Sequence, residues 1–194
     1  MALRDRFRRK TLDGPVVRPE ERPDDVPRAV LADLGRGEQV LASAREDDGG
    51  RWVVLTTWRL LERTPEGETL LDRPWHLVDT GAWDPEAWTL SVSFVDGHEP
   101  RGWRLQRLTG PGRVAGVFRD RTTASVVLTR AVDLGPRRTA RVTVRKVLRT
   151  RELREQVILG HGARAGDPDL AARVLAARQE LRDQTGMDPL PQRP

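Results

Sequence analysis

The central part of the chain reads as a succession of β-strands and carries all six tryptophans of the protein, between residues 51 and 108. Residues 88–94, WTLSVSF, alternate apolar and polar side chains, which is typical of a strand with one buried face. A helix-like segment follows at residues 113–131. Strands that precede a single covering helix indicate an α+β protein with an antiparallel core.

Turn signals divide the strand-rich region. Residues 51–63, RWVVLTTWRLLER, are rich in β-branched and aromatic residues, so we expect one long strand there. The strand predicted at residues 75–83 is expected to bend at Gly81. A short helix begins near Pro27. The predicted strands of this region cover residues 39–44, 51–63, 69–71, 75–83, 88–94 and 102–108.

The segment at residues 113–131 has apolar side chains at spacings of three and four, which predicts an amphipathic helix. Its TTASVVLT centre nevertheless has high β propensity. Glycines in the preceding GPGRVAG stretch, residues 110–116, resemble those of a phosphate-binding loop. Because the flanking strands read as antiparallel and no Lys-Ser/Thr pair follows, we interpret this stretch as a strand-to-helix turn.

The LGP at residues 134–136 looks like a boundary, and a hairpin and a helix are predicted beyond it. Residues 140–148 and 152–159 can pair as antiparallel strands. Asp167 is a favourable N-cap for a helix over residues 168–184. The predicted buried stripe of this helix contains Leu170, Val174, Ala177 and Leu181.

The net charge of +5 is unevenly distributed along the chain. Residues 1–10 hold five basic side chains and one acidic side chain, and residues 137–155 hold eight basic and two acidic ones. Residues 11–136 hold 16 basic and 21 acidic side chains. The protein is therefore expected to be an acidic body with two basic segments.

The basic arm at residues 1–10 surrounds two apolar side chains with arginines, and Arg4, Arg8 and Arg9 are candidate contacts to an anionic partner. Such a segment can lie on an anionic membrane surface. It can equally contact nucleic-acid phosphates, or be a solvated end of the chain. We expect residues 1–26 to be mostly disordered, because they are charged and punctuated by prolines.

The basic hairpin offers a second candidate surface. Arg141, Arg145 and Arg149 are expected to line one face of it. A basic two-stranded ribbon can follow RNA or DNA phosphates, or its charges can protect an exposed strand edge against aggregation. Trp75 and Trp83 flank a short strand and are candidates for a partly exposed partner contact. Most of the other four tryptophans are expected in the core.

Composition and motifs favour a binding role over catalysis. The chain has no Cys and only three His, without metal-ligand spacing, and it contains no Gly-x-Ser-x-Gly elbow. We therefore expect no enzyme activity, no metal and no cofactor. No apolar run approaches the ~20 residues of a membrane span. The first ten residues lack the apolar stretch of a secretory signal, so a cytoplasmic location is expected.

Between about residues 26 and 134 a predicted helix follows a succession of four stretches: GEQVLASAREDDGGRWVVLTTWRLL, PWHLVDTGAWD, WTLSVSFVDG and GWRL. This succession resembles the pleckstrin-homology-like (PH-like) proteins of actinobacteria. Thr56 and Arg59 in LTTWRLL stand where such domains carry a Thr-x-x-Arg-Leu signature. The resemblance implies a seven-stranded β-roll or barrel capped by a helix, with a binding role. The first hairpin loop here, EDDGG, is acidic, so phosphoinositide binding is not carried over.

We therefore expect an α+β, PH-like domain followed by a hairpin-and-helix appendage. Its expected function is a binding or adaptor module that recognises a protein partner, with the membrane's inner face as a further contact. The alternative is a nucleic-acid-associated protein that uses the basic arm and hairpin. The expected divisions are an arm at residues 1–26, the PH-like domain at 27–134, the appendage at 137–186 and a tail at 187–194.

Overall fold

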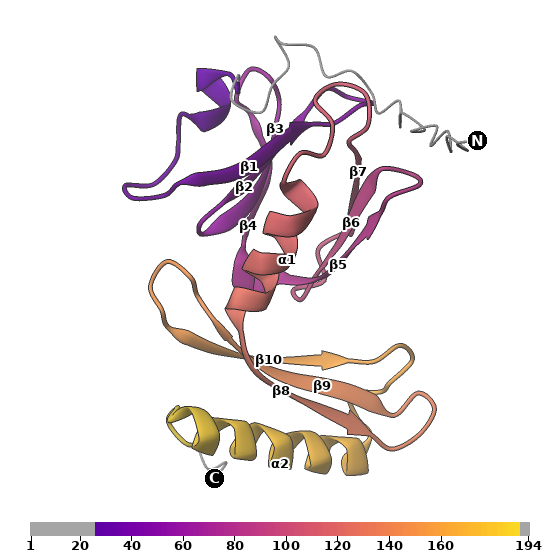
Figure 1. The fold of residues 1–194 in the computed structure, drawn as a ribbon. Helices are drawn as coiled ribbons and strands as arrows, with labels where there is room; N and C mark the ends of the chain where they lie inside the picture. The colour runs from indigo at the N-terminus through magenta and orange to yellow at the C-terminus, as the bar shows by residue number, and fades with distance from the viewer. Residues whose placement is uncertain (1–25, 191–194) are drawn as a thin grey trace, which may run out of the picture.

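The computed structural model describes residues 26–190, and residues 1–25, which include the basic arm, lie outside them. The described part is an α+β fold of three antiparallel sheets and two α-helices (Figure 1). A short 3₁₀ helix, Arg28–Leu31, stands where a helix was predicted near Pro27. The sheets do not close into a barrel, so the expectation of a barrel is corrected to separate sheets.

The first sheet has the strand order β1-β2-β3-β4 and the second the order β5-β6-β7. The helix α1, Val114–Ser125, packs against both sheets, and these two sheets and α1 form the first layer of the molecule. One core cluster joins these elements, with Leu55, Trp75, Trp103 and Phe118 among its buried members. The strands are β1 (Val40–Arg45), β2 (Trp52–Thr56), β3 (Arg59–Arg63), β4 (Thr69–Pro74), β5 (Val78–Asp84), β6 (Thr89–Phe94) and β7 (Arg101–Arg104).

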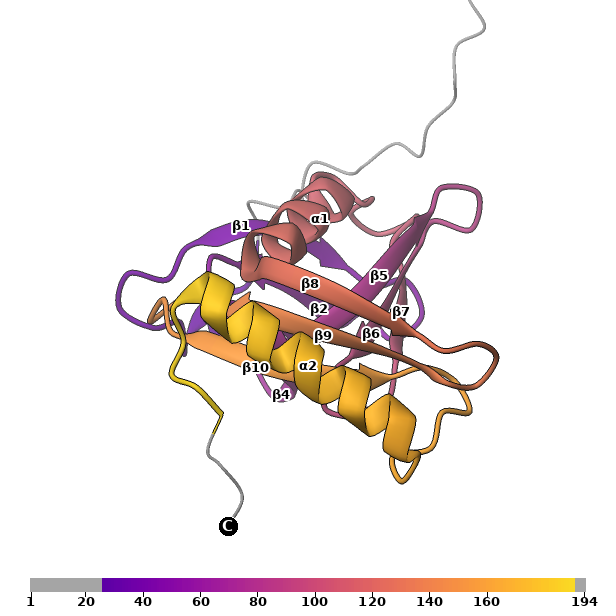
Figure 2. The same cartoon turned by 90° about the horizontal axis from the view of Figure 1, so that it is seen from below.

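The third sheet, of order β10-β9-β8, forms a second layer with the helix α2 (Figures 1 and 2). Its strands are β8 (Val126–Asp133), β9 (Thr139–Lys146) and β10 (Leu153–Leu159). The predicted hairpin is confirmed as β9 and β10, which pair antiparallel over their whole length. The predicted C-terminal helix is confirmed as α2, Pro168–Thr185.

Several predictions of regular structure were wrong. Residues 51–63 form two strands, because the Thr56 hydroxyl accepts hydrogen bonds from the backbone N–H groups of Trp58 and Arg59 and closes a tight turn. The segment 102–108 is strand only to Arg104. The helix predicted to residue 131 ends at Ser125, and the β-branched residues that follow pair with β9 instead.

Gly81 allows β5 to approach α1 closely. A Cβ built at Gly81 would lie 2.3 Å from the Cε1 atom of Phe118, whereas a Cβ at Gly102 on β7 would meet nothing within 4 Å. Gly81→Ala is therefore expected to lower the free energy of unfolding by about 1–3 kcal/mol through overpacking. Gly102→Ala, the control in the same sheet, is expected to change it by less than about 0.5 kcal/mol. Chemical denaturation measures both, and equal effects would contradict the close contact.

Asp167 caps α2 by accepting hydrogen bonds from the backbone N–H groups of Asp169 and Leu170. Hydrogen bonds from Arg138, together with the cap, lower the pKa of Asp167 from 3.8 to about 2. Because the folded-state pKa is depressed, this carboxylate stabilises the fold fully above about pH 4, and the stabilisation is lost as pH falls through about 2. An NMR titration should show this low pKa, and Arg138→Gln should raise it. An unchanged pKa in that variant would contradict the assignment.

Candidate binding groove

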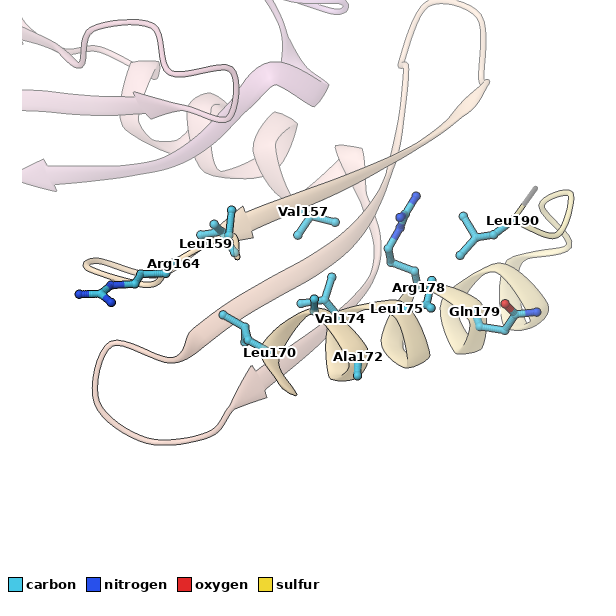
Figure 3. Close-up of a pocket in the computed structure, with 12 residues that line it drawn as sticks. Val157, Leu159, Arg164, Leu170, Ala172, Val174, Leu175, Arg178, Gln179 and Leu190 are labelled. Carbon is cyan, nitrogen blue, oxygen red and sulfur yellow. The ribbon is translucent and has the colours of Figure 1, made fainter. Parts of the chain in front are cut away.

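An open apolar groove of about 910 Å³ lies between β10 and α2. Figure 3 shows Val157 and Leu159 of β10 across from Val174 and Leu175 of α2. Val157, Leu159 and Leu175 are 40%, 39% and 53% exposed. They are three of the six exposed large hydrophobic side chains among residues 26–190. Exposed apolar surface therefore gathers at this place.

The groove is open because α2 sits off-centre on its sheet. The helix packs against β9 and β8, where Leu170, Ala177 and Leu181 are buried. The inner face of β10 is left partly uncovered beside the helix. A helix that packed over β10 would bury Val157 and Leu159. Such burial would stabilise the fold by about 25 cal/mol for each Å² of apolar surface removed from water. This stabilisation is absent from the described fold, because Val157 and Leu159 remain partly exposed.

Charged side chains hold α2 at this position and border the groove. Glu155 of β10 is nearly buried and accepts hydrogen bonds from the Nε atoms of Arg178 and Arg182, at 2.5 and 2.8 Å. Arg164 and Gln179 line the groove and are exposed. An apolar floor with a polar rim is the usual anatomy of a protein-recognition surface.

The backbone of β10 is open on the groove side of the sheet. In the strand order β10-β9-β8, this strand is hydrogen-bonded to β9 alone. The stretch from Gln156 to Gly160 carries no charged side chain. Uncharged, apolar edge strands readily accept another strand, and proteins usually protect them with charge. The groove therefore offers main-chain pairing as well as apolar contact.

A second groove, of about 570 Å³, is lined by residues of β5 and α1. Trp83, Leu90 and Phe118 supply its apolar surface, and Arg119 lines it as well. Trp83 is partly exposed, in agreement with its prediction as an edge residue, and meets Trp88 edge to face at 6.4 Å between ring centroids. β5 is also an edge strand.

Trp75 was predicted to be partly exposed, and this was wrong. Residues 75–77 form a 3₁₀ turn ahead of β5 instead of strand, which turns the indole into the core. Trp75 is fully buried, its Nε1–H donates to the Thr56 carbonyl at 2.9 Å, and its ring meets Phe118 edge to face. It belongs to the scaffold of the β5–α1 groove and is not a surface contact.

The arginines of the predicted basic ribbon do not form one free face. Arg141 and Arg145 point toward the first layer, where both pair with Asp79. Arg145 is 2% exposed, and burial lowers its pKa. Arg149 instead lies over the Trp58 ring, 5.2 Å from its centroid. The remaining candidates, Arg4, Arg8 and Arg9, lie outside the described residues.

The signature residues Thr56 and Arg59 have a structural role. Thr56 donates to Glu38 at 2.6 Å, and Arg59 donates from Nε to the same carboxylate at 2.9 Å. Burial raises the pKa of Glu38, but hydrogen bonds from Arg59, Thr56 and the Gly35 amide lower it overall. The motif thus ties the segment before β1 to the β2–β3 hairpin.

The β10–α2 groove was not predicted from the sequence. The predicted buried stripe of α2 was correct at Leu170, Ala177 and Leu181. The available signal was Leu175, which lies outside that stripe, together with the uncharged Val-Ile-Leu run of β10. Exposed apolar residues on both facing elements indicate an unfilled groove between them.

Comparisons with known proteins identify no relative of this chain: no family model matches, and neither the curated proteins nor the solved structures contain a match. Within residues 26–190, no three His, Cys, Asp or Glu side chains are placed to hold a metal ion. The same residues include no helix with the length and hydrophobicity needed to cross a membrane.

Proposed function

We propose that this protein is a non-enzymatic binding or adaptor module that recognises a protein partner, with the β10–α2 groove as its main contact surface. The observation that carries the proposal is the gathering of Val157, Leu159 and Leu175 around an open groove beside an unpaired strand edge. Apolar patches of this kind on otherwise charged proteins mark sites of protein interaction. An extended apolar segment could add to β10 and place alternate side chains against α2.

The proposal includes a PH-like first layer, which the sequence resemblance implies. A four-stranded sheet, a three-stranded sheet and then α1 agree with the order of elements that the sequence resemblance implies. PH-like modules mostly bind other molecules. The β5–α1 groove, with Trp83 at its edge, is a second contact surface in this proposal.

The membrane hypothesis rests on residues 1–10, and the nucleic-acid hypothesis rests on this arm and on the basic hairpin. In the described residues, Arg145 is buried and Arg141 is paired with Asp79, so neither is free to follow nucleic-acid phosphates as a ribbon. The nucleic-acid alternative therefore has less support than a protein partner. A cytoplasmic position with the arm at the inner face of the membrane remains part of the proposal.

The proposal is tested with a pair of variants that place the same charge at similarly apolar surface positions. Leu175→Glu puts a carboxylate in the groove, while Leu70→Glu changes an exposed leucine on β4 outside it. We expect Leu175→Glu to weaken binding of a co-purified protein partner by at least about tenfold, and Leu70→Glu to leave it unchanged. Circular dichroism checks that both variants are folded. Equal affinity of both variants and the wild type would contradict the proposal.

A further inference from the structure

A small pocket of about 330 Å³ lies where the two layers meet. The end of α1 and the strands β5, β8 and β9 form its walls. Every residue that lines it except Val126 has a polar side chain. Its polar lining includes Asp79, Thr122, Thr123, Arg141, Thr143 and Arg145, and we call it the interlayer pocket.

Three buried polar atoms at this pocket have no hydrogen-bond partner among the described residues. Arg145 donates from Nη1 to the Ser125 hydroxyl at 3.0 Å and from Nη2 to the Asp79 carbonyl at 3.1 Å, but its Nε–H is unpaired. The Nε atom of Arg141 and the hydroxyl of Thr122 are unpaired as well. Buried polar groups are normally satisfied, so three at one place point to a ligand that accepts hydrogen bonds.

The charges at the pocket also favour an acceptor that is negative. Arg141 and Arg145 share a single carboxylate, Asp79, at 3.7 Å from Arg145. Arg119 lines the adjoining β5–α1 groove, which shares Asp79, Thr122 and Thr123 with the pocket. The partial negative charge at the C-terminal end of α1 offsets only a fraction of the positive charge of these arginines. A positive surplus remains, and burial makes the charge of Arg145, which is 2% exposed, costly to leave uncompensated.

We propose that the interlayer pocket binds a phosphate group, presented either as inorganic phosphate or as a small phosphomonoester. Guanidinium groups pair with phosphate oxygens through charge-assisted hydrogen bonds, and threonine hydroxyls donate to the oxygens that remain. The tetrahedral anion offers acceptors in several directions, and the unpaired donors come from both β9 and α1. This site does not depend on the β10–α2 groove, so either proposal can fail without the other.

The test is an NMR titration of the full-length protein at constant ionic strength, with inorganic phosphate, glycerol phosphate and acetate as probes. Phosphate is expected to shift the amide signals of Thr122, Thr123 and Thr143 and the Arg Nε–H signals in a saturable way. Acetate should bind at least about tenfold more weakly, because a planar carboxylate reaches fewer donors. Tighter binding of glycerol phosphate than of phosphate would assign the site to a phosphomonoester. The reverse order would assign it to the free ion.

Three variants locate the binding. Arg141→Gln and Thr122→Val are each expected to weaken phosphate binding by about tenfold or more, whereas Arg130→Gln, on β8 and paired with Glu180, should not. Thr122→Val should also leave the phosphate-free protein at least as stable as the wild type, because it removes an unpaired buried hydroxyl.

A gain of affinity provides the sharpest comparison. Asp79→Asn removes the carboxylate that competes for both arginines, so phosphate is expected to bind this variant more tightly, by about tenfold. The proposal is overturned if phosphate produces no saturable shift, if the shifts lie outside the pocket, or if Arg141→Gln and Thr122→Val bind phosphate as well as Arg130→Gln does.

Discussion

Trp75→Ala is expected to lower the free energy of unfolding by about 3–5 kcal/mol, the largest effect of any single substitution considered for this protein. Trp75 is fully buried between the two sheets of the first layer and α1. Its loss would leave a cavity and an unpaired carbonyl at Thr56, which now accepts from the indole N–H at 2.9 Å. Denaturant unfolding, followed by circular dichroism, measures the change.

Two further variants separate packing from surface effects. Trp75→Phe retains an aromatic ring but removes the indole donor, and we expect a loss of about 2 kcal/mol. Trp83→Ala changes a partly exposed tryptophan of the same region and is expected to cost about 1 kcal/mol. A loss at Trp83 as large as that at Trp75 would contradict the distinction between a core residue and a groove residue.

Asp79→Asn is expected to lower the free energy of unfolding by about 3 kcal/mol, because it removes the counterion of a buried guanidinium. Arg145 is 2% exposed, and Asp79 is the one carboxylate paired with it among the described residues. Since Asp79 belongs to the first layer and Arg145 to the second, the loss should appear as weaker contact between the layers. Hydrogen exchange should then rise in β8 and β9 before it rises in β2 and β3.

The control for this substitution is Asp96→Asn. Asp96 pairs with Arg73 at 3.6 Å in a partly exposed position, where an ion pair contributes less than about 1 kcal/mol. Equal stability losses for the two variants would show that Asp79 acts as an ordinary surface charge. The account of how the two layers are joined would then fail.

Periodicity predicted the elements whose burial follows a simple pattern. In β6, Leu90, Val92 and Phe94 are buried, as their alternation with polar residues indicated. The long strand predicted at residues 51–63 failed because a threonine hydroxyl, and not a glycine or proline, makes the turn. The helix predicted to residue 131 failed because its β-branched end pairs with β9. The first error arises from a hydrogen-bonded turn that composition and spacing do not encode, whereas in the second the β propensity of the VVLT residues outweighed the helical spacing.

The candidate site could be predicted only in part. The sequence indicated the two strands of the hairpin and the buried stripe of α2, but the groove depends on where that helix lies across its sheet. The ion pairs of Glu155 on β10 with Arg178 and Arg182 on α2 contribute to this position, and they join residues more than 20 positions apart in the chain. The basic ribbon was predicted wrongly for a similar reason. Arg141 pairs with Asp79, which lies 62 residues earlier in the chain, and the sequence does not indicate this pairing.

Site-specific photo-crosslinking in living cells tests most directly whether the groove binds a protein. A photoreactive amino acid is placed at position 175 in one version of the full-length protein and at position 70 in another. We expect a protein to be captured from position 175 and not from position 70, and Val157→Glu to abolish this capture. Equal capture from both positions, capture that survives Val157→Glu, or nucleic acid or lipid as the only captured species would contradict the account.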